Sequence, residues 1–314
     1  MILCQYLHSV HLIQIIQNTK SPNPEVDASY ELAIKLAKEV DADVVAITDP
    51  DGDRLGVVAK HNGEYVLMSG NQSAAVYLEY ILSQRKEKGT LPDNAVMYNT
   101  IVTSDLGELV ARNYGVDVEK TLTGFKFIGD KIRKYEKTHE KQFIFGYEES
   151  YGCVVEDFVR DKDAVQAVLL AAECGNYYKK QGKDLIDVLN ELYAKYGTFK
   201  ESQIALAKAG AAGAARIKEM MDTLRQDKPT EIGGVKVVLS EDYATSERSD
   251  GTTIDLPKSN VLKYYLEDGS WIAARPSGTE PKCKFYFSIK GKDAKDAADK
   301  TEVFHKAMME LIGE

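Results

Sequence analysis

The chain has 314 residues, of which 44% are hydrophobic and 28% charged, with a formal net charge of −9. These values are typical of a globular protein with two or three domains. An acidic chain lacks the basic face that general nucleic-acid binding needs, and no apolar run approaches the roughly 18 residues of a membrane span. We therefore expect no nucleic acid and no membrane as partners. The four cysteines, Cys4, Cys153, Cys174 and Cys283, are far apart, which argues against a zinc site or a disulfide framework and favours the cytoplasm.

Residues 1–20 are apolar and poor in acids. They have neither a basic start nor a small-residue cleavage site, so a signal peptide is disfavoured. We expect a buried strand or helix there, or a segment left by truncation.

From Ser21 onward, helices and strands are predicted to alternate. Asp27 is expected to cap a helix, and the apolar run at 43–47 predicts a buried strand. Further strands are predicted at 95–101, 116–121 and 142–147, and helices at 105–115, from about 125, and at 161–181. This alternation predicts parallel α/β layers.

Beyond Gly197 the pattern changes. Residues 207–221 are either a helix or a linker, and 228–234 form a plausible boundary. Strands are predicted at 235–239, 270–274 and 282–289, followed by a helix with one apolar stripe from Ala297 to Leu311. These elements predict a separate α+β domain of roughly 85 residues.

The loop ITDPDGDRLG, residues 47–56, carries Asp49, Asp51 and Asp53 at alternate positions. Clustered carboxylates repel each other, and all-oxygen ligation suits Mg²⁺ or Ca²⁺. Arg54 follows at once, which indicates an anionic group, such as a phosphate, near the metal. An EF-hand is excluded because its sixth residue would be Arg54 and its twelfth Lys60. A dehalogenase-type phosphotransferase fits less well, since Asp53 stands where Thr or Val belongs, and a solvated acidic turn is disfavoured.

Two further loops carry groups that suit anions. In ARPSGTEPK, residues 274–282, the guanidinium, hydroxyls, glycine and lysine resemble an anion nest, although a simple turn between strands explains the prolines and glycine too. The residues concerned are Arg275, Ser277, Gly278, Thr279 and Lys282. In TLTGFKFIG, residues 121–129, Thr123, Gly124 and Lys126 precede a helix, where an anion site or an ordinary capped loop is expected.

Two other stretches suit a sugar or its phosphate. GYEESYG, residues 146–152, places Glu148, Glu149 and Ser150 on a glycine-bounded loop, which suits sugar hydroxyls or is an exposed acidic turn. RDKDA, residues 160–164, supplies Lys162 as a phosphate ligand, an acid/base group or a surface lysine.

The ordered set TDPDGDR, TLTGFKFIG, GYEESYG, RDKDA and RPSGTEPK resembles the α-D-phosphohexomutase family, and within it bacterial phosphoglucomutases, from about Lys20 to the C-terminus. The resemblance implies three-layer α/β units followed by a smaller α+β domain. It implies part of the family's second domain at 1–93 with the metal loop, the third at 94–228 with the sugar loop, and the fourth at 229–314 with the phosphate loop.

The resemblance also implies roles for individual residues. Mg²⁺ would be held by Asp49, Asp51 and Asp53, and the sugar bound by Glu148 and Ser150. Lys162 would contact the substrate, with Arg54 also catalytic, while Thr123, Gly124 and Lys126 would assist binding. The second phosphate would be bound by Arg275, Ser277, Gly278 and Thr279. The implied reaction converts glucose 1-phosphate to glucose 6-phosphate through glucose 1,6-bisphosphate.

One expected motif is absent from the sequence. The family nucleophile is a serine in a T-A-S-H-N-P loop, and the nearest string here is KSPNPE, in which Ser21 is interpreted as a structural turn residue. Three hypotheses remain open: a truncated phosphoglucomutase, which is favoured because the other loops are intact, a half-enzyme completed by a separate chain, and a non-catalytic phosphosugar-binding module. The chain alone is expected to be inactive, and the sequence leaves open whether glucose, mannose or pentose phosphates are preferred.

Overall fold

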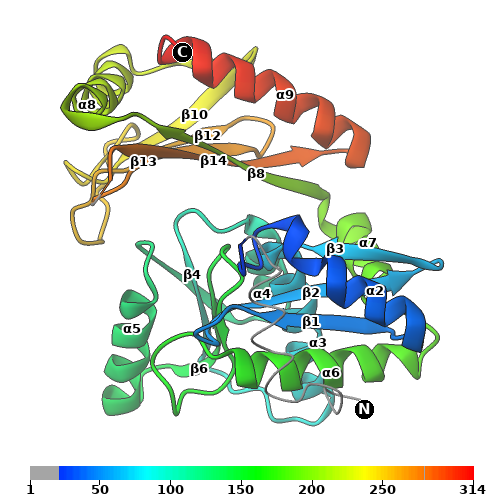
Figure 1. The fold of residues 1–314 in the computed structure, drawn as a ribbon. Coiled ribbons are helices and arrows are strands. Elements are labelled where there is room, and N and C mark those ends of the chain that lie inside the picture. The colour runs from blue at the N-terminus through cyan, green and yellow to red at the C-terminus, as the bar shows by residue number, and fades with distance from the viewer. Residues whose placement is uncertain (1–20, 279) are drawn as a thin grey trace. The chain divides into compact units, whose positions relative to one another are not determined.

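The computed structural model describes residues 21–278 and 280–314, and the chain divides into two compact units (Figure 1). The N-terminal unit ends at Leu192, and the C-terminal unit runs from Tyr193 to Glu314. The expectations for residues 1–20 and for Thr279 lie outside the described residues.

The first sheet of the N-terminal unit is antiparallel, in the order β1-β2-β3. Its strands are β1 (Val44–Thr48), β2 (Leu55–His61) and β3 (Glu64–Met68). Helix α2 (Glu31–Val40) packs on one face, where Ala37 meets Val45. Helix α6 (Ala164–Lys179) lies against the other face, where Gly175 approaches Val44. Val44 and Val45 are neighbours in β1 and therefore point to opposite faces of the sheet. The two helices thus lie on opposite sides, and the sheet forms the middle of three layers.

Two local predictions about this region are wrong. The expected parallel arrangement fails for β1, which pairs antiparallel with β2, a strand that was not predicted, with Thr48 opposite Leu55. Only six residues join them, whereas a parallel crossover takes about a dozen or more. The expected cap at Asp27 also fails: Asp27 begins the 3₁₀ turn η1 (Asp27–Tyr30), and α2 starts at Glu31 without a side-chain cap. In β1, expected to be buried, Val45 is the one buried residue.

The second sheet of this unit has the order β5-β4-β6-β7. The central strand β4 pairs parallel with β5 and β6, while β7 pairs antiparallel with β6. These elements, with their helices, confirm the predicted α/β alternation between residues 95 and 181. Their bounds are β4 (Ala95–Thr100), α4 (Asp105–Asn113), β5 (Asp117–Thr121), α5 (Phe125–Thr138), β6 (Gln142–Tyr147) and β7 (Cys153–Val154). Sequence analysis missed two helices, α3 (Gly70–Glu87) and α7 (Leu185–Tyr196).

The C-terminal unit is an antiparallel sheet in the order β11-β10-β12-β13-β14-β8, with β9 beside β10. Helices α8 (Gly210–Asp227) and α9 (Ala294–Leu311) pack on one face of this sheet (Figure 1). The strands are β8 (Thr198–Ala207), β9 (Glu231–Ile232), β10 (Val235–Asp242), β11 (Glu247–Arg248), β12 (Leu262–Leu266), β13 (Trp271–Pro276) and β14 (Lys282–Gly291). The predicted strands and final helix are confirmed, and the stretch 207–221 is largely helix.

Strand β8, which sequence analysis missed, pairs with β14 along its whole length. It therefore joins the C-terminal unit together with α8. The predicted boundaries at residues 93 and 228 separate domains of the family. The division into two compact units does not test these boundaries, so they stay predictions. No helix in the part of the chain that the structure describes is long and apolar enough to cross a membrane.

Candidate functional site

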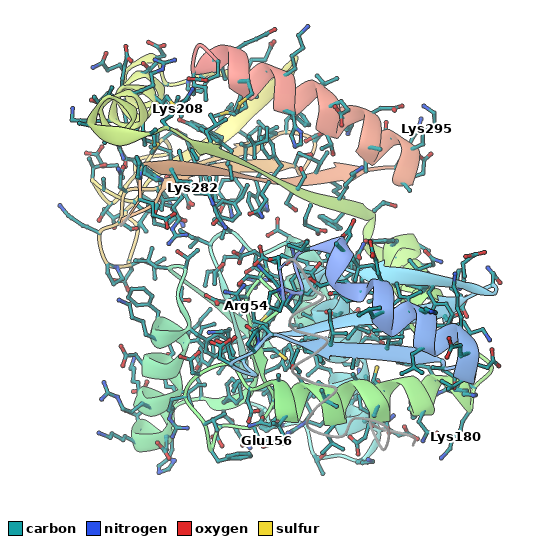
Figure 2. The ribbon with its side chains drawn as sticks, in the orientation of Figure 1. Arg54, Glu156, Lys180, Lys208, Lys282 and Lys295 are labelled. Atoms are coloured by element: carbon teal, nitrogen blue, oxygen red, sulfur yellow. The ribbon has the colours of Figure 1, made fainter. Side chains whose placement is uncertain are left out.

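The acidic loop joins β1 to β2 and carries Arg54, which Figure 2 labels. The loop curls around one carboxylate: Asp49 Oδ1 accepts the backbone N–H groups of Asp53 at 3.1 Å and of Arg54 at 3.0 Å. Gly52 has φ +70°, in the left-handed region that glycine adopts at little cost. One oxygen from each of Asp49, Asp51 and Asp53 lies within 4.8 Å of the others. The local geometry thus gathers three carboxylates at one point.

These carboxylates fit a hard divalent cation. Asp53 Oδ1 is buried and accepts no hydrogen bond from any described residue, although buried oxygens are normally satisfied. Burial, together with the neighbouring Asp53, raises the pKa of Asp49. A bound cation would satisfy the orphaned oxygen and offset the repulsion, and all-oxygen ligation suits Mg²⁺.

Lys162 reaches this loop from the segment before α6. Its Nζ lies 2.9 Å from Asp53 Oδ2 and 2.9 Å from Asp161 Oδ1. Burial alone would lower the pKa of Lys162, but the hydrogen bonds to Asp161 and Asp53 outweigh burial and raise it. The side chain crosses Gly152, where an added Cβ would lie 2.7 Å from Lys162 Cγ. Lys162 is therefore a protonated ammonium held beside the acidic loop, and the absence of a side chain at position 152 makes room for its side chain.

The predicted sugar loop runs from β6 to β7 and contacts the acidic loop directly. The backbone N–H of Leu55 donates to Tyr151 O at 2.9 Å, and Arg54 forms a bridge with Gly152. Glu148 is buried, which raises the pKa of its carboxyl group, and its Oε1 accepts the N–H of Gly124 at 2.8 Å. Gly124 is the N-cap of α5. The loops around residues 53, 124, 148 and 162 therefore meet in the N-terminal unit, although they are far apart in sequence.

The sugar loop is anchored by contacts that sequence analysis missed. An added Cβ at Gly70, the first residue of α3, would lie 2.7 Å from Tyr151 N and closer still to Glu149 O. Glu149 Oε2 accepts the hydroxyl of the buried Thr100 at 3.1 Å. The loop thus packs against α3 and the end of β4. No local pattern signals these contacts, because each joins distant segments.

Other predicted site residues are less buried or make weaker side-chain contacts. Ser150 and Thr123 are half-buried, and Lys126 is exposed with its Nζ 5.0 Å from the centroid of the Phe127 ring. Sequence analysis also missed Glu25, which pairs with Arg54 at 3.0 Å.

The predicted phosphate loop belongs to the C-terminal unit, where it connects β13 to β14 as a hairpin. Ser277 donates its backbone N–H to Lys282 O at 2.7 Å, and Ser277 Oγ accepts the N–H of Glu280 at 3.3 Å. Arg275 Nη1 donates to the Tyr286 hydroxyl at 3.3 Å. Gly278 is exposed, with open space where a side chain would be. The turn between strands is confirmed, and the anion nest stays a prediction.

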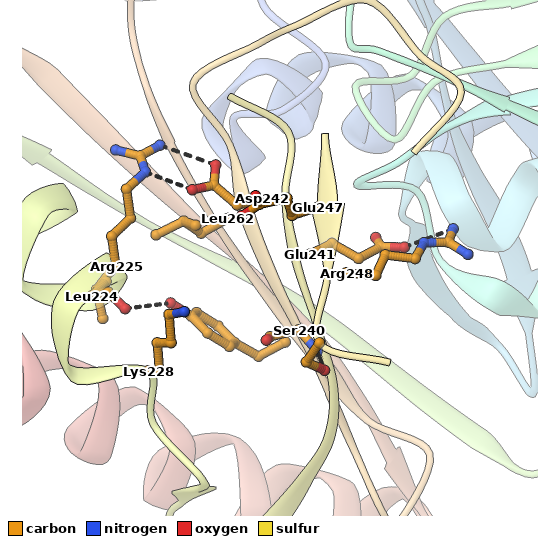
Figure 3. Close-up of a pocket in the computed structure, with 11 residues that line it drawn as sticks. Leu224, Arg225, Lys228, Ser240, Glu241, Asp242, Glu247, Arg248 and Leu262 are labelled. Carbon is orange, nitrogen blue, oxygen red and sulfur yellow. Dashed lines mark hydrogen bonds and ion pairs between the residues drawn. The ribbon is translucent and has the colours of Figure 1, made fainter. Parts of the chain in front are cut away.

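Two other charged features have structural explanations. A groove of about 120 Å³ in the C-terminal unit is lined by charges that pair within it (Figure 3): Arg225 contacts Asp242 at 2.9 Å, and Arg248 contacts Glu241 at 2.8 Å. A cluster of His61, Asp184 and Asp187 lies at the start of α7, where Asp184 Oδ1 accepts the N–H of Asp187 at 3.0 Å. The acids of this cluster therefore cap a helix, and the charges that line the groove neutralise one another.

The fold and the site define a multidomain α/β protein with an acidic loop suited to a divalent cation. Three family models match the chain, all described as phosphoglucomutase/phosphomannomutase: alpha/beta/alpha domain II at residues 11–63, alpha/beta/alpha domain III at 69–196 and the C-terminal domain at 207–304. The chain belongs to the phosphoglucomutase/phosphomannomutase family.

Similar curated proteins are phosphoglucomutases from Staphylococcus. The one from S. haemolyticus is 39% identical over 278 residues, covering 87% of this chain and 50% of that protein. The one from S. aureus strain MRSA252 is 39% identical over 289 residues, covering 90% and 51%. The chain thus spans about half the length of the curated relatives it matches.

Solved structures share the fold. Parafusin, a phosphoglucomutase from Paramecium in its open form, superposes with a TM-score of 0.65 at 19% identity, covering 93% of this chain and 51% of that one. A phosphoglucomutase/phosphomannomutase family protein from Burkholderia thailandensis gives a TM-score of 0.60 at 19% identity, covering 92% and 51%.

Proposed function

We propose that the chain supplies the metal, sugar and second-phosphate loops of a phosphoglucomutase-type phosphohexomutase. In this proposal, the complete enzyme interconverts glucose 1-phosphate and glucose 6-phosphate through glucose 1,6-bisphosphate. The observation that supports the proposal is the 2.9 Å contact between Lys162 Nζ and Asp53 Oδ2, because it joins the lysine proposed to bind the substrate to one of the proposed metal ligands.

Each loop has a distinct proposed task. Asp49, Asp51 and Asp53 would hold Mg²⁺, which when bound supplies positive charge for phosphoryl oxygens. The Arg54 guanidinium and the Lys162 ammonium would donate hydrogen bonds to the same phosphoryl group.

The sugar and the second phosphate fall to other loops. The carboxylate of Glu148 would accept, and the hydroxyl of Ser150 would donate or accept, hydrogen bonds from sugar hydroxyls. Thr123, Gly124 and Lys126, at the start of α5, would bind oxygens beside them. The guanidinium of Arg275, the hydroxyls of Ser277 and Thr279 and the amide of Gly278 would bind the phosphate at the other end of the sugar.

We further propose that the chain has no mutase turnover by itself and acts in the cytoplasm, without nucleic acid or membrane partners. The sequence contains no T-A-S-H-N-P loop, and covalent phosphoryl transfer requires a nucleophile. A separate chain that carries the serine domain would complete the site.

NMR titration of the purified chain with glucose 6-phosphate, with and without Mg²⁺, tests this function. We expect amide shifts at Glu148, Ser150 and Gly278, with glucose as the control that lacks phosphate. Absence of shifts at millimolar glucose 6-phosphate would contradict phosphosugar binding. Binding that is intact, combined with no turnover after adding a serine domain from a Staphylococcus relative, would favour the non-catalytic module.

A further inference from the structure

Arg54 has one short side-chain contact and two longer ones. Its Nη1 donates to Glu25 Oε1 at 3.0 Å, a charge-assisted hydrogen bond. Its Nε lies 3.7 Å from Asp49 Oδ2 and 3.8 Å from Asp53 Oδ1, which are beyond hydrogen-bond distance. The guanidinium is therefore held beside two of the three predicted metal ligands without bonding to their side chains.

Glu25 is itself fixed by the packing of the segment before α2. Its backbone N–H donates to Asn23 Oδ1 at 3.0 Å, and the carbonyl of the preceding Pro24 accepts the Tyr30 hydroxyl at 2.7 Å. Tyr30 is fully buried, and its Cζ lies 2.8 Å from where a Cβ on Gly56 would be. Because Gly56 lacks a side chain, the segment packs onto β2 two residues after Arg54, which brings the carboxylate of Glu25 to the guanidinium.

If the hydrogen bond to Glu25 were absent, Arg54 could form a closer contact with Asp49 or Asp53. A guanidinium and a carboxylate form bidentate hydrogen bonds at about 2.7–2.9 Å, so a movement of roughly 1 Å would bond Arg54 to Asp49 or Asp53. Such a bond would occupy the oxygens that a divalent cation needs. A free Arg54 would therefore compete with the metal.

We propose that Glu25 is a positioning residue that holds Arg54 back from the metal ligands and so keeps the acidic loop available for Mg²⁺. The proposal rests on the proposed metal site. Among the described residues, Glu25 is the one hydrogen-bond acceptor of the Arg54 side chain, so Nη2 stays available for an anionic ligand.

A double-mutant cycle on the full chain tests this role, with Mg²⁺ affinity measured by calorimetry. Glu25→Ala should weaken Mg²⁺ binding roughly tenfold, because a charge-assisted hydrogen bond between Arg54 and an aspartate must then be broken. In the Arg54→Gln background, the same Glu25→Ala change should have almost no effect, since the competing cation is gone. Asp27→Asn is the matched control: this exposed acid lies two residues away and should leave the affinity unchanged.

A second observable follows the arginine itself. In the wild type without Mg²⁺, the Nη–H signals of Arg54 should be protected from exchange, because Nη1 donates to Glu25, and Glu25→Ala should remove this protection. The Nε–H signal should shift in the same variant, because Nε then bonds to an aspartate. Glu25→Gln keeps an acceptor oxygen without the charge, so it should weaken Mg²⁺ binding less than Glu25→Ala and serves if the alanine variant is unstable.

The outcomes separate this inference from the proposed function. Equal weakening by Glu25→Ala in both backgrounds would overturn positioning, because it would mean that Glu25 acts only through its charge. Unchanged Mg²⁺ affinity in Glu25→Ala with a lower melting temperature would overturn it too, leaving Glu25 as an anchor of its segment. Failure of the wild type to bind Mg²⁺ would overturn both the metal site and the inference.

Discussion

Replacement of Gly152 by alanine tests how Lys162 reaches the metal loop. The added methyl group would lie 2.7 Å from Lys162 Cγ and 3.2 Å from Cε, with Cδ closer still. The backbone of Gly152 does not have positive φ, so alanine fits the local conformation, and the three atoms nearest to the added methyl group all belong to Lys162. We expect the Lys162 side chain to leave Asp53.

The expected cost follows from the contact that is lost. The side chains of Lys162 and Asp53 are 13% and 28% exposed, so the pair is only partly screened by solvent. A charge-assisted hydrogen bond contributes about 1.5–3 kcal/mol, and the exposure of Asp53 reduces this to about 1–2 kcal/mol. The melting temperature of the N-terminal unit should fall by roughly 2–8 °C.

Differential scanning calorimetry is the appropriate assay, because the single tryptophan, Trp271, lies in the C-terminal unit and tryptophan fluorescence therefore does not report on the N-terminal unit. Gly278→Ala is the matched control, since its added methyl group meets nothing within 4 Å. In a Lys162→Ala background, Gly152→Ala should add almost nothing. An unchanged melting temperature in Gly152→Ala, or the same loss in both backgrounds, would show that the contact between Lys162 and Asp53 does not depend on the missing side chain at position 152.

Three further predictions concern the rest of the chain. Arg275→Ala should weaken phosphate binding in an NMR titration about ten- to a hundredfold, and Arg275→Lys should recover little; equal binding in all three would place the phosphate elsewhere. The purified chain should show no turnover of glucose 1-phosphate with glucose 1,6-bisphosphate and Mg²⁺, and turnover that Ser21→Ala abolishes would show that Ser21 is a nucleophile. Burial lowers the pKa of His305 from its usual value of 6.5. The C-terminal unit should therefore have its full stability above pH 6.5 and lose stability as the pH falls through the folded-state pKa of His305. Urea unfolding followed by Trp271 fluorescence should show this loss, and His305→Gln should reduce the pH dependence of the free energy of unfolding.

Elements with a clear local pattern could be predicted from the sequence. Strands β4, β5 and β6 are separated by turn and helix signals, and β14 alternates apolar and polar residues. Helix α3 was missed because most of its surface is buried, so it has no polar face to define a stripe. Strands β2 and β3 were not predicted, and without β2 the short connection that makes its pairing with β1 antiparallel could not be recognised.

The site was predictable in its loops but not in its contacts. The three aspartates and Glu148 stand out by residue type and spacing, and family resemblance suggested their roles. The pairing of Glu25 with Arg54 spans 29 positions, and the passage of Lys162 over Gly152 depends on a missing side chain. Such contacts arise from tertiary packing, and nothing in a local pattern of a single sequence encodes them.

The central claim is that Asp49, Asp51 and Asp53 form a site for a divalent cation, and calorimetric titration with Mg²⁺ tests it most directly. We expect weak but measurable binding to the wild-type chain, a further loss in Asp51→Asn, and no change in Asp250→Asn, which removes an exposed carboxylate in the C-terminal unit. Tight Mg²⁺ binding that is unchanged in Asp51→Asn, or no binding by the wild type, would contradict it.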